Sequence, residues 1–453
     1  MIHVIGASLA LAAMSTLGFP VNGPGEPHGD KNPKSGDRDE RRTSLFDSDV
    51  RVTYQPGEGV TFASMDNNAS LRISGRGEAK VYLANRENSE DEFSLAARRA
   101  RLQADGYVFS RDVTYLIQTE LTQNPAILDA VVGWRFFNDE DYEMSAQVGL
   151  QKPRSSLQFE TDSRYTMFAE RSAATRTFSE ARAVAALVEG SALPTDEGAP
   201  QLFWHAGLMN NDVAGGSTFF QGSIGNVPQI EASTNEANEI NFLLGAMFAP
   251  NGLPGDGKHM RSWREGDLDH DDVFRLAFGG NLFVGNDSAF VPVNNAVGKI
   301  DNDALQLNAF AALKTGTGVA AQTEIFVRSD DPDGFASQDS FGWYAQGSYT
   351  TAPGDGMQWG FAGRLSLVTL DGVGPMIVRD GLSRGNTLTA GPAPSVAVAD
   401  GDLLEFQVAL NAFYHKTAMM SQIMYTYQSA DAEPGAGFDQ DNHGFDILFR
   451  LMF

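Results

Sequence analysis

The sequence predicts an all-β fold: a transmembrane antiparallel β-barrel of about sixteen strands, with short periplasmic turns and long outer loops. Three observations support this class. Segment after segment alternates apolar residues with polar or small ones, which is the side-chain period of a β-strand. Many of these segments run to about ten residues, the length that crosses a bilayer at a tilt. The connections between them alternate between tight turns and long links.

Composition narrows the classes of partner and site. The 453 residues include no cysteine, which excludes disulfides and thiolate metal sites and suits an oxidising compartment. Asp and Glu total 58 against 33 Lys and Arg, giving a formal net charge of −25. A nucleic acid would be repelled by such a charge, so we expect no nucleic-acid partner.

The start of the chain differs from the remainder. Met1 to Phe19 hold an apolar stretch of signal-peptide size, so we expect a signal peptide over residues 1–20. Residues 21–49 are rich in Pro, Gly, Asp, Lys and Arg, and we assign 21–70 to a polar flexible linker or N-terminal extension. The barrel domain is assigned to residues 71–453.

The last segment shows the alternation most clearly. Phe445, Ile447 and Phe449 lie on one face, while Asp446 and Arg450 lie on the other. The same pattern predicts sixteen strands, and an even number is the rule for bacterial barrels. In order they are 71–83, 98–109, 112–121, 128–137, 142–151, 182–190, 201–210, 239–249, 272–283, 302–313, 318–328, 341–350, 358–369, 403–414, 418–428 and 444–453.

The connections between predicted strands define two ends of the barrel, one with short turns and one with long loops. Tight turns at 110–111, 138–141, 314–317, 351–357 and 415–417 alternate with long links at 152–181, 211–238 and 370–402. One connection breaks the rule, because 250–271 falls on the short-turn side and is long. Aromatic residues of the apolar faces collect at the short-turn ends, as in a girdle at the membrane–water interface: Phe136, Phe248, Phe274, Tyr349, Trp359, Tyr414 and Phe453.

If the apolar faces meet lipid, the alternate faces line the interior of the barrel. They carry charges of both signs, which would be prohibitive in a dry soluble core but suit a water-filled lumen. The candidate pore-lining residues are Arg99, Arg101, Arg135, Glu120, Asp129, Arg275, Glu324, Arg364, Glu405 and Arg450.

The sequence offers no catalytic pattern. It contains no GxSxG, P-loop or HExxH motif, and its seven His show no metal-ligand spacing. We therefore expect no enzyme, no cofactor and no metal site.

Two stretches resemble the phosphate-selective porin O and P family. Phe93–Asp105 reads FSLAARRARLQAD and carries the Arg-Arg-x-Arg-type run of that family at Arg98, Arg99 and Arg101. Val148–Ser172 is similar to the family's third-loop region. Its Gly-x-x-K-x-Pro-like sequence and later Glu-Arg-Ser are matched by Gly149, Gln151 or Lys152, Pro153, Glu170, Arg171 and Ser172.

This resemblance implies a bacterial outer-membrane porin that forms homotrimers and passes anions such as phosphate. It also implies that the third outer loop, residues 152–181, folds into the lumen and narrows it. The constriction residues would be Lys152, Arg154, Arg164, Glu170 and Arg171. The terminal Phe453 resembles the signal read by the barrel-assembly machinery.

The expected function is passive diffusion of small hydrophilic solutes or ions through a barrel embedded in outer-membrane lipid. Two alternatives remain open. Long acidic loops such as 370–402 would suit a closed outer-membrane barrel that acts as an adhesin or receptor. A soluble β-sandwich or surface-layer protein would dissolve without detergent.

Overall fold

The structure is a computed structural model. It describes residues 50–86, 91–122, 126–139, 142–179, 182–195, 198–210, 240–254, 257, 259–293, 296–332, 337–354, 356–371, 401–432 and 440–453. The predicted signal peptide, the linker up to residue 49 and most of the long links 211–238 and 370–402 lie outside these residues.

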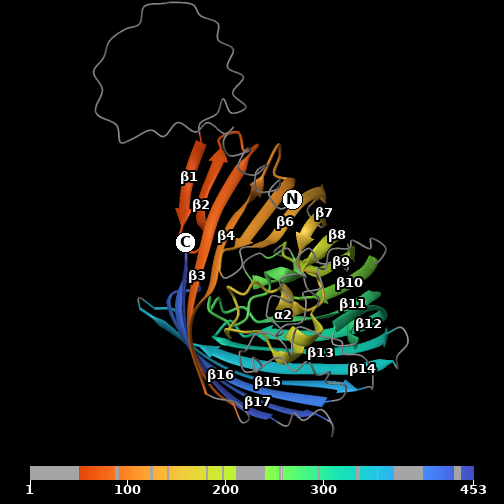
Figure 1. Ribbon diagram of the computed structural model, residues 1–453. Coiled ribbons are helices and arrows are strands. Elements are labelled where there is room, and N and C mark those ends of the chain that lie inside the picture. The colour runs from red at the N-terminus through yellow and green to blue at the C-terminus, as the bar shows by residue number, and fades with distance from the viewer. Residues whose placement is uncertain are drawn as a thin grey trace, which may run out of the picture. The chain divides into compact units, whose positions relative to one another are not determined.

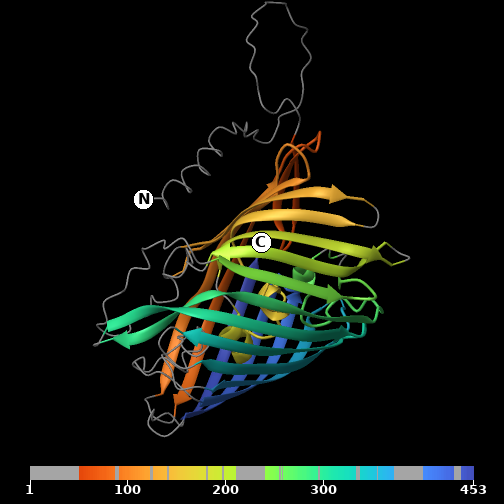
Figure 2. The same cartoon turned by 90° about the vertical axis from the view of Figure 1, so that its right-hand side faces the viewer.

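Sixteen antiparallel strands form a closed barrel (Figures 1 and 2). Each strand pairs with the next along the chain, and β18 pairs with β3 to close the ring. The strands are β3 (Ser70–Arg86), β4 (Glu92–Tyr107), β5 (Val113–Glu120), β6 (Ala126–Asn138), β7 (Glu143–Gln151), β8 (Ala183–Pro194), β9 (Pro200–Asn210), β10 (Ile240–Phe248), β11 (Arg275–Val293), β12 (Ala296–Lys314), β13 (Val319–Pro332), β14 (Gln338–Thr350), β15 (Gln358–Asp371), β16 (Gly401–His415), β17 (Met419–Ala432) and β18 (Gln440–Met452).

The sixteen predicted segments are confirmed as the sixteen barrel strands, although several ends differ. The largest differences are at the long-loop side, where β11 continues to Val293 and β12 already begins at Ala296. The apolar alternation fades beyond Gly285 because Asn286, Asp287 and Ser288 follow in a row. Backbone pairing between two neighbouring strands continues past the point where the side-chain pattern stops.

A hairpin precedes the barrel and corrects the predicted linker. Residues 50–64 form β1 (Val50–Gln55) and β2 (Gly59–Ser64), and β2 pairs with the start of β3. The linker assignment over 21–70 is therefore wrong for this part. Val50, Val52 and Tyr54 give β1 the β-branched and aromatic pattern of a strand, and Gly57 supplies the positive φ of 78° that the turn requires.

The two faces of the strands separate as the alternation predicts. On β18, Phe445, Ile447 and Phe449 are exposed on the outer face, while Asp446 and Arg450 are buried toward the interior. The ring is sealed where β18 ends, because the backbone groups of Gly75 and Phe453 form two hydrogen bonds of 3.0 Å.

The interior holds two connections that enter from opposite ends (Figure 1). The third outer loop joins β7 to β8 and contains two short helices, α2 (Leu157–Glu160) and α3 (Ala173–Phe178). The β10–β11 connection, residues 249–274, enters from the short-turn side and contains the 3-10 turn η2 (Met260–Ser262). Among the described residues, no helix is both long and apolar enough to span a membrane.

Candidate functional site

The third outer loop lies inside the barrel and packs on the inner wall. The ring of Phe178 stacks on Phe326 of β13 with centroids 5.4 Å apart, and both are buried. Ala174 and Phe178 of α3 approach Gly342 of β14 so closely that a β-carbon there would lie 2.3 Å from the Phe178 ring. The small inward residue on β14 thus makes room for the helix.

Two wall carboxylates hold the starts of the two helices. Glu324 accepts the backbone N–H groups of Leu157, at 3.2 Å, and Gln158, at 2.6 Å. Glu405 accepts the N–H of Ala173 at 3.0 Å. The first N–H groups of a helix have no partner within the helix, so these carboxylates satisfy them and fix the loop to β13 and β16.

Donors from the wall bind carbonyl oxygens of the same loop. Arg364 of β15 donates to the Glu170 carbonyl at 2.8 Å, and Arg450 of β18 donates to the Arg164 carbonyl at 3.0 Å. Gln422 of β17 donates to the Met167 carbonyl at 2.8 Å. These bonds attach the backbone of the loop to the wall, in addition to the contacts of its side chains.

These contacts correct part of the predicted pore lining. Glu324, Arg364, Glu405 and Arg450 point into the barrel as predicted, but each is at most 2% exposed beneath the loop. They hold the loop in place and do not face open space. Sequence alternation tells which face a side chain is on, but it cannot tell what covers that face.

Along β4 and β5 the inward side chains are less buried than those beneath the loop. Arg99 and Arg101 of β4 and Glu120 of β5 are partly exposed there, and Arg101 forms an ion pair with Glu120 at 2.8 Å. Asp129 of β6 pairs with Arg182 at 3.0 Å. Arg182 immediately precedes β8 and is the first residue of the predicted strand 182–190, but it was not among the predicted pore-lining residues.

A β-bulge directs two successive arginines into this sector. Glu78 pairs with Arg99 and Ala79 pairs with Ala97, so Arg98 is the extra residue on β4. In a regular strand Arg98 and Arg99 would point to opposite faces. Here both guanidinium groups reach Glu78, which also accepts from Arg450 at 2.8 Å.

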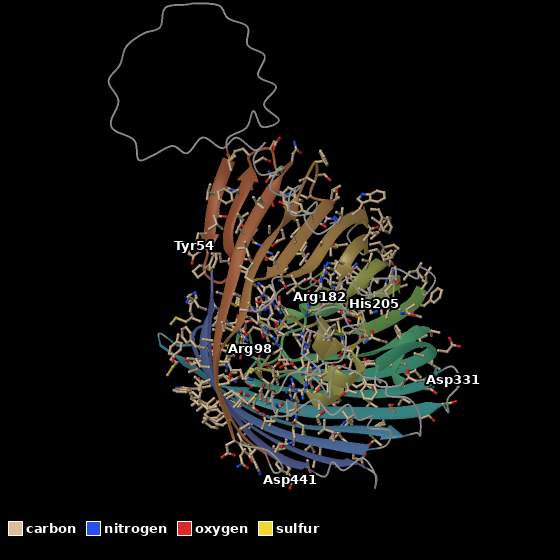
Figure 3. All side chains as sticks on the ribbon, in the orientation of Figure 1. Tyr54, Arg98, Arg182, His205, Asp331 and Asp441 are labelled. Carbon is tan, nitrogen blue, oxygen red and sulfur yellow. The ribbon has the colours of Figure 1, made fainter. Side chains whose placement is uncertain are left out.

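Arg98 also ties the third outer loop to β4 (Figure 3). Its Nε donates to Glu170 at 2.8 Å. Burial alone would raise the pKa of the Glu170 carboxyl, but Arg98 and the nearby Lys80 and Arg99 outweigh it and lower the pKa to about 2. Glu170 therefore stays charged and paired at any pH a cell envelope meets.

Two loop cations in the open sector have no carboxylate partner among the described residues. Lys152 donates to the Phe159 carbonyl at 3.1 Å, and Arg171 donates to the Gln158, Phe159 and Thr161 carbonyls at 3.1 Å each. Burial and the nearby Arg171 and Arg182 lower the pKa of Lys152 well below its usual value. By contrast, Arg164 pairs with Asp162 within the loop at 2.8 Å.

Two further predicted residues lie near the short-turn ends of the strands. Arg135 pairs with Asp112 of the β4–β5 turn at 2.7 Å, and Arg275 pairs with Asp271 of the β10–β11 connection at 2.5 Å. Arg154 is buried and lies 3.3 Å from Glu189 of β8. Arg154 therefore contributes to fastening the loop.

Comparison with known proteins supports the fold and shows a partial match to one family. Residues 75–196 match the family model described as phosphate-selective porin O and P. An anion-selective porin from Comamonas acidovorans has a similar structure, with a TM-score of 0.50 and 11% identity over 85% of this chain and 100% of that chain. The outer-membrane channel DcaP of Acinetobacter baumannii gives 0.48 and 10%, over 87% and 100%.

No curated protein sequence matches the chain. The closed sixteen-strand barrel, its apolar outer belt and the matched porin region together place the protein in the bacterial outer membrane. Residues 75–196, which include the arginine run of β4 and the third outer loop, are thus similar to the phosphate-selective porin O and P family.

Proposed function

We propose that this protein is a passive diffusion channel that favours small anions, and that the third outer loop narrows its passage. The passage would run between that loop and the wall formed by β3–β8. The observation that carries the proposal is the excess of cations in this sector. The cations are Arg76, Arg98, Arg99, Arg101, Lys152, Arg164, Arg171 and Arg182, against the carboxylates Glu78, Glu120, Asp129, Asp162 and Glu170.

Lys152 and Arg171 are the centre of this excess, because neither is neutralised by a described carboxylate. A fixed positive charge beside a narrow aqueous path attracts anions and repels cations. The solute class is therefore small anions such as inorganic phosphate. Backbone carbonyls hold the two side chains in place without cancelling their charge.

The test is recording from the purified, folded protein in planar bilayers under asymmetric KCl. We expect discrete conductance steps and a reversal potential of the sign that marks chloride as the more permeant ion. Added phosphate should lower the chloride current if it enters the same path. Folded protein that conducts cations in preference to anions would contradict the proposed anion selectivity but not the proposed channel function.

A closed barrel acting as an adhesin or receptor is the second candidate. It is favoured by the filled interior along β9–β18, where the wall side chains are buried under the two inner connections. Folded protein that never conducts, but captures a ligand from solution, would favour it over the channel.

The proposal extends to the assembly of the protein. We expect a homotrimer, as the resemblance to the porin family implies, and recognition of Phe453 by the barrel-assembly machinery. Native mass measurement in detergent would test the trimer. Phe453→Ala should lower the amount of folded barrel in the outer membrane, because its ring also packs against Gly75.

A further inference from the structure

The β10–β11 connection is unlike its neighbours on the short-turn side. Connections there, such as 315–318 and 416–418, are short, whereas this one spans 249–274. Its described residues lie largely buried inside the barrel, including Leu253, Met260, Trp263, Glu265 and Asp267. A long exposed turn would need no such burial, so the connection is built to sit in the interior.

The wall of the barrel fixes this connection in place. Lys314 of β12 donates to the Gly266 carbonyl at 2.6 Å, and the N–H of Gly318 donates to Asp267 at 2.8 Å. The Trp263 indole N–H donates to Gln322 of β13 at 3.1 Å. These bonds come from strands β12 and β13 and from the turn between them.

The connection also binds the third outer loop directly. The Glu265 carboxylate accepts the Gln158 side-chain N–H and the Met167 backbone N–H, both at 2.8 Å. The guanidinium of Arg264 lies 4.4 Å from the centre of the Tyr165 ring, within cation–π range. Glu265 is 3% exposed, so its two loop partners replace the water it has lost.

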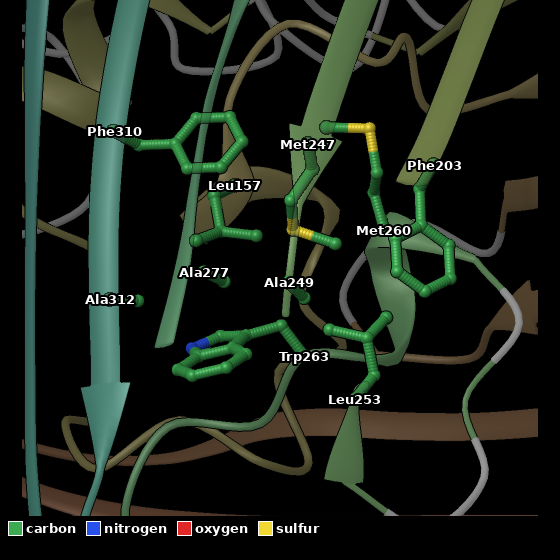
Figure 4. Packing of buried hydrophobic residues seen from close by; sticks show 10 residues of the cluster. All are labelled: Leu157, Phe203, Met247, Ala249, Leu253, Met260, Trp263, Ala277, Phe310 and Ala312. Carbon is green, nitrogen blue, oxygen red and sulfur yellow. The ribbon is translucent and has the colours of Figure 1, made fainter. Parts of the chain in front are cut away.

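An apolar cluster joins the two connections to the wall (Figure 4). Leu157 of the loop lies among Met260 and Trp263 of the connection, with Phe203 of β9 and Phe310 of β12 around them. Nearby, Glu189 of β8 receives Arg154 from the loop and Arg261 from the connection, each at 3.3 Å. The two segments thus share one packed unit inside the barrel.

We propose that the β10–β11 connection is a second constriction element of the pore. It enters from the short-turn side, holds the third outer loop through Glu265, and closes the space along β9–β18 to solutes. Ions would then be confined to the cationic sector along β3–β8. This inference rests on the proposed channel function, because a constriction element has a role only in a barrel that conducts ions.

The first experiment compares two carboxylates of the connection. Glu265→Ala removes both hydrogen bonds to the loop, whereas Asp272→Asn removes an exposed carboxylate of the same connection. We expect Glu265→Ala to raise single-channel conductance by about twofold and to weaken the anion preference, because ions gain access to a second, less cationic path. Asp272→Asn should match the wild type.

A cysteine pair makes the test independent of the stability of Glu265→Ala. The chain has no cysteine, and a β-carbon at Gly266 would lie 3.2 Å from Cγ of Met167, the position that a cysteine sulfur at 167 would take. Met167→Cys with Gly266→Cys should therefore form a disulfide between the loop and the connection. Added to Glu265→Ala, this bridge should restore wild-type conductance, and a reducing agent should raise it again.

The outcomes separate the two proposals. Wild-type protein that folds and never conducts overturns the channel function and this inference with it. Wild-type protein that conducts, together with an unchanged conductance and reversal potential in Glu265→Ala, overturns the constriction role alone. A folded cysteine pair that stays reduced under oxidant would also contradict it, because the two segments would not meet as described.

Discussion

At the scale of single residues, most charged side chains of the interior form ion pairs, and a few do not. The bulge at Arg98 brings two adjacent arginines to Glu78, and Arg101 and Arg182 each have their own carboxylate. Lys152 and Arg171 bind carbonyl oxygens and have no carboxylate partner in the described part of the chain. Since the paired charges largely cancel, the selectivity of the passage is expected to depend on these two.

Replacing Lys152 tests that expectation. Lys152→Gln should reduce the ratio of chloride to potassium permeability by several-fold, because one uncompensated charge is lost. In the wild type the anion preference is present while Lys152 is protonated, and it falls as pH rises through a pKa that lies below the usual lysine value. Reversal potentials measured over a pH series would show this fall.

Lys152→Arg supplies the control. A guanidinium keeps its charge at all accessible pH values, so this variant should hold its anion preference where the wild type loses it. If wild type and Lys152→Arg lose preference at the same pH, another group controls selectivity.

Glu160 is a buried carboxylate of the third outer loop, and neither of its oxygens is hydrogen-bonded to a described residue. Burial raises its pKa to about 7, although Arg154 opposes this. Because the folded-state pKa is raised, the folded protein is favoured at low pH and loses stability as pH rises from about 4.5 to about 7, by roughly 3 kcal/mol in all.

Glu160→Gln should therefore raise the thermal stability of the folded barrel at pH 8 and leave it nearly unchanged at pH 4. Heat-dependent migration in detergent gels at the two pH values measures this difference. Equal gains at both pH values would mean that the charge of Glu160 is not the cause.

At the scale of elements, the third outer loop is held by features of the wall that are spread over many strands. Glu324 and Glu405 receive helix N–H groups, and Arg364 and Arg450 donate to carbonyls. Gly342 on β14 leaves the space that α3 fills. The wall and the loop are therefore complementary in shape as well as in hydrogen bonding.

Two glycines on neighbouring strands allow a matched comparison. Gly342 faces α3, whereas a β-carbon at Gly363 of β15 would meet no atom within 4 Å. Gly342→Val should displace α3, lower stability by about 1–3 kcal/mol and expose the loop to protease. Gly363→Val should leave α3, the stability and the protease resistance of the loop unchanged. Thermal melting and limited proteolysis measure both effects. Equal melting temperatures and cleavage rates in the two variants would contradict the contact between Gly342 and α3.

At the scale of the whole molecule, the barrel is stable only because its outer face meets lipid. Leu365 and Phe406 are paired across β15 and β16 and lie exposed on that face, with the buried Arg364 and Gln407 behind them. The outer belt is apolar and the interior polar, which is the inverse of a soluble protein.

An arginine on the belt should therefore damage folding. We expect Leu365→Arg to cost about 2–4 kcal/mol near the middle of the bilayer and to lower the folded fraction after insertion into vesicles. Thr317→Arg, placed in an exposed short turn, should fold like the wild type. Equal folded fractions for the two variants in a heat-shift assay would argue against a lipid-facing Leu365.

The sixteen strands, their inner and outer faces and the inward third loop could be predicted because each depends on local pattern or on a family motif. Alternation with a period of two is a property of neighbouring residues, so it survives in the bare sequence. The β1–β2 hairpin was missed because the preceding residues are polar, although Val50 to Gln55 carry a strand pattern of their own.

What the sequence determined by itself is therefore a barrel with charged residues facing inward. Only the tertiary structure decided which of those charges are covered and which stay open. Glu324 and Arg99 share the same alternating pattern, yet one lies beneath the third outer loop and the other faces the cationic sector. The physical reason is that a loop satisfies its backbone groups with partners up to 286 positions away, as Arg450 and Arg164 show, and no periodicity records such a pairing.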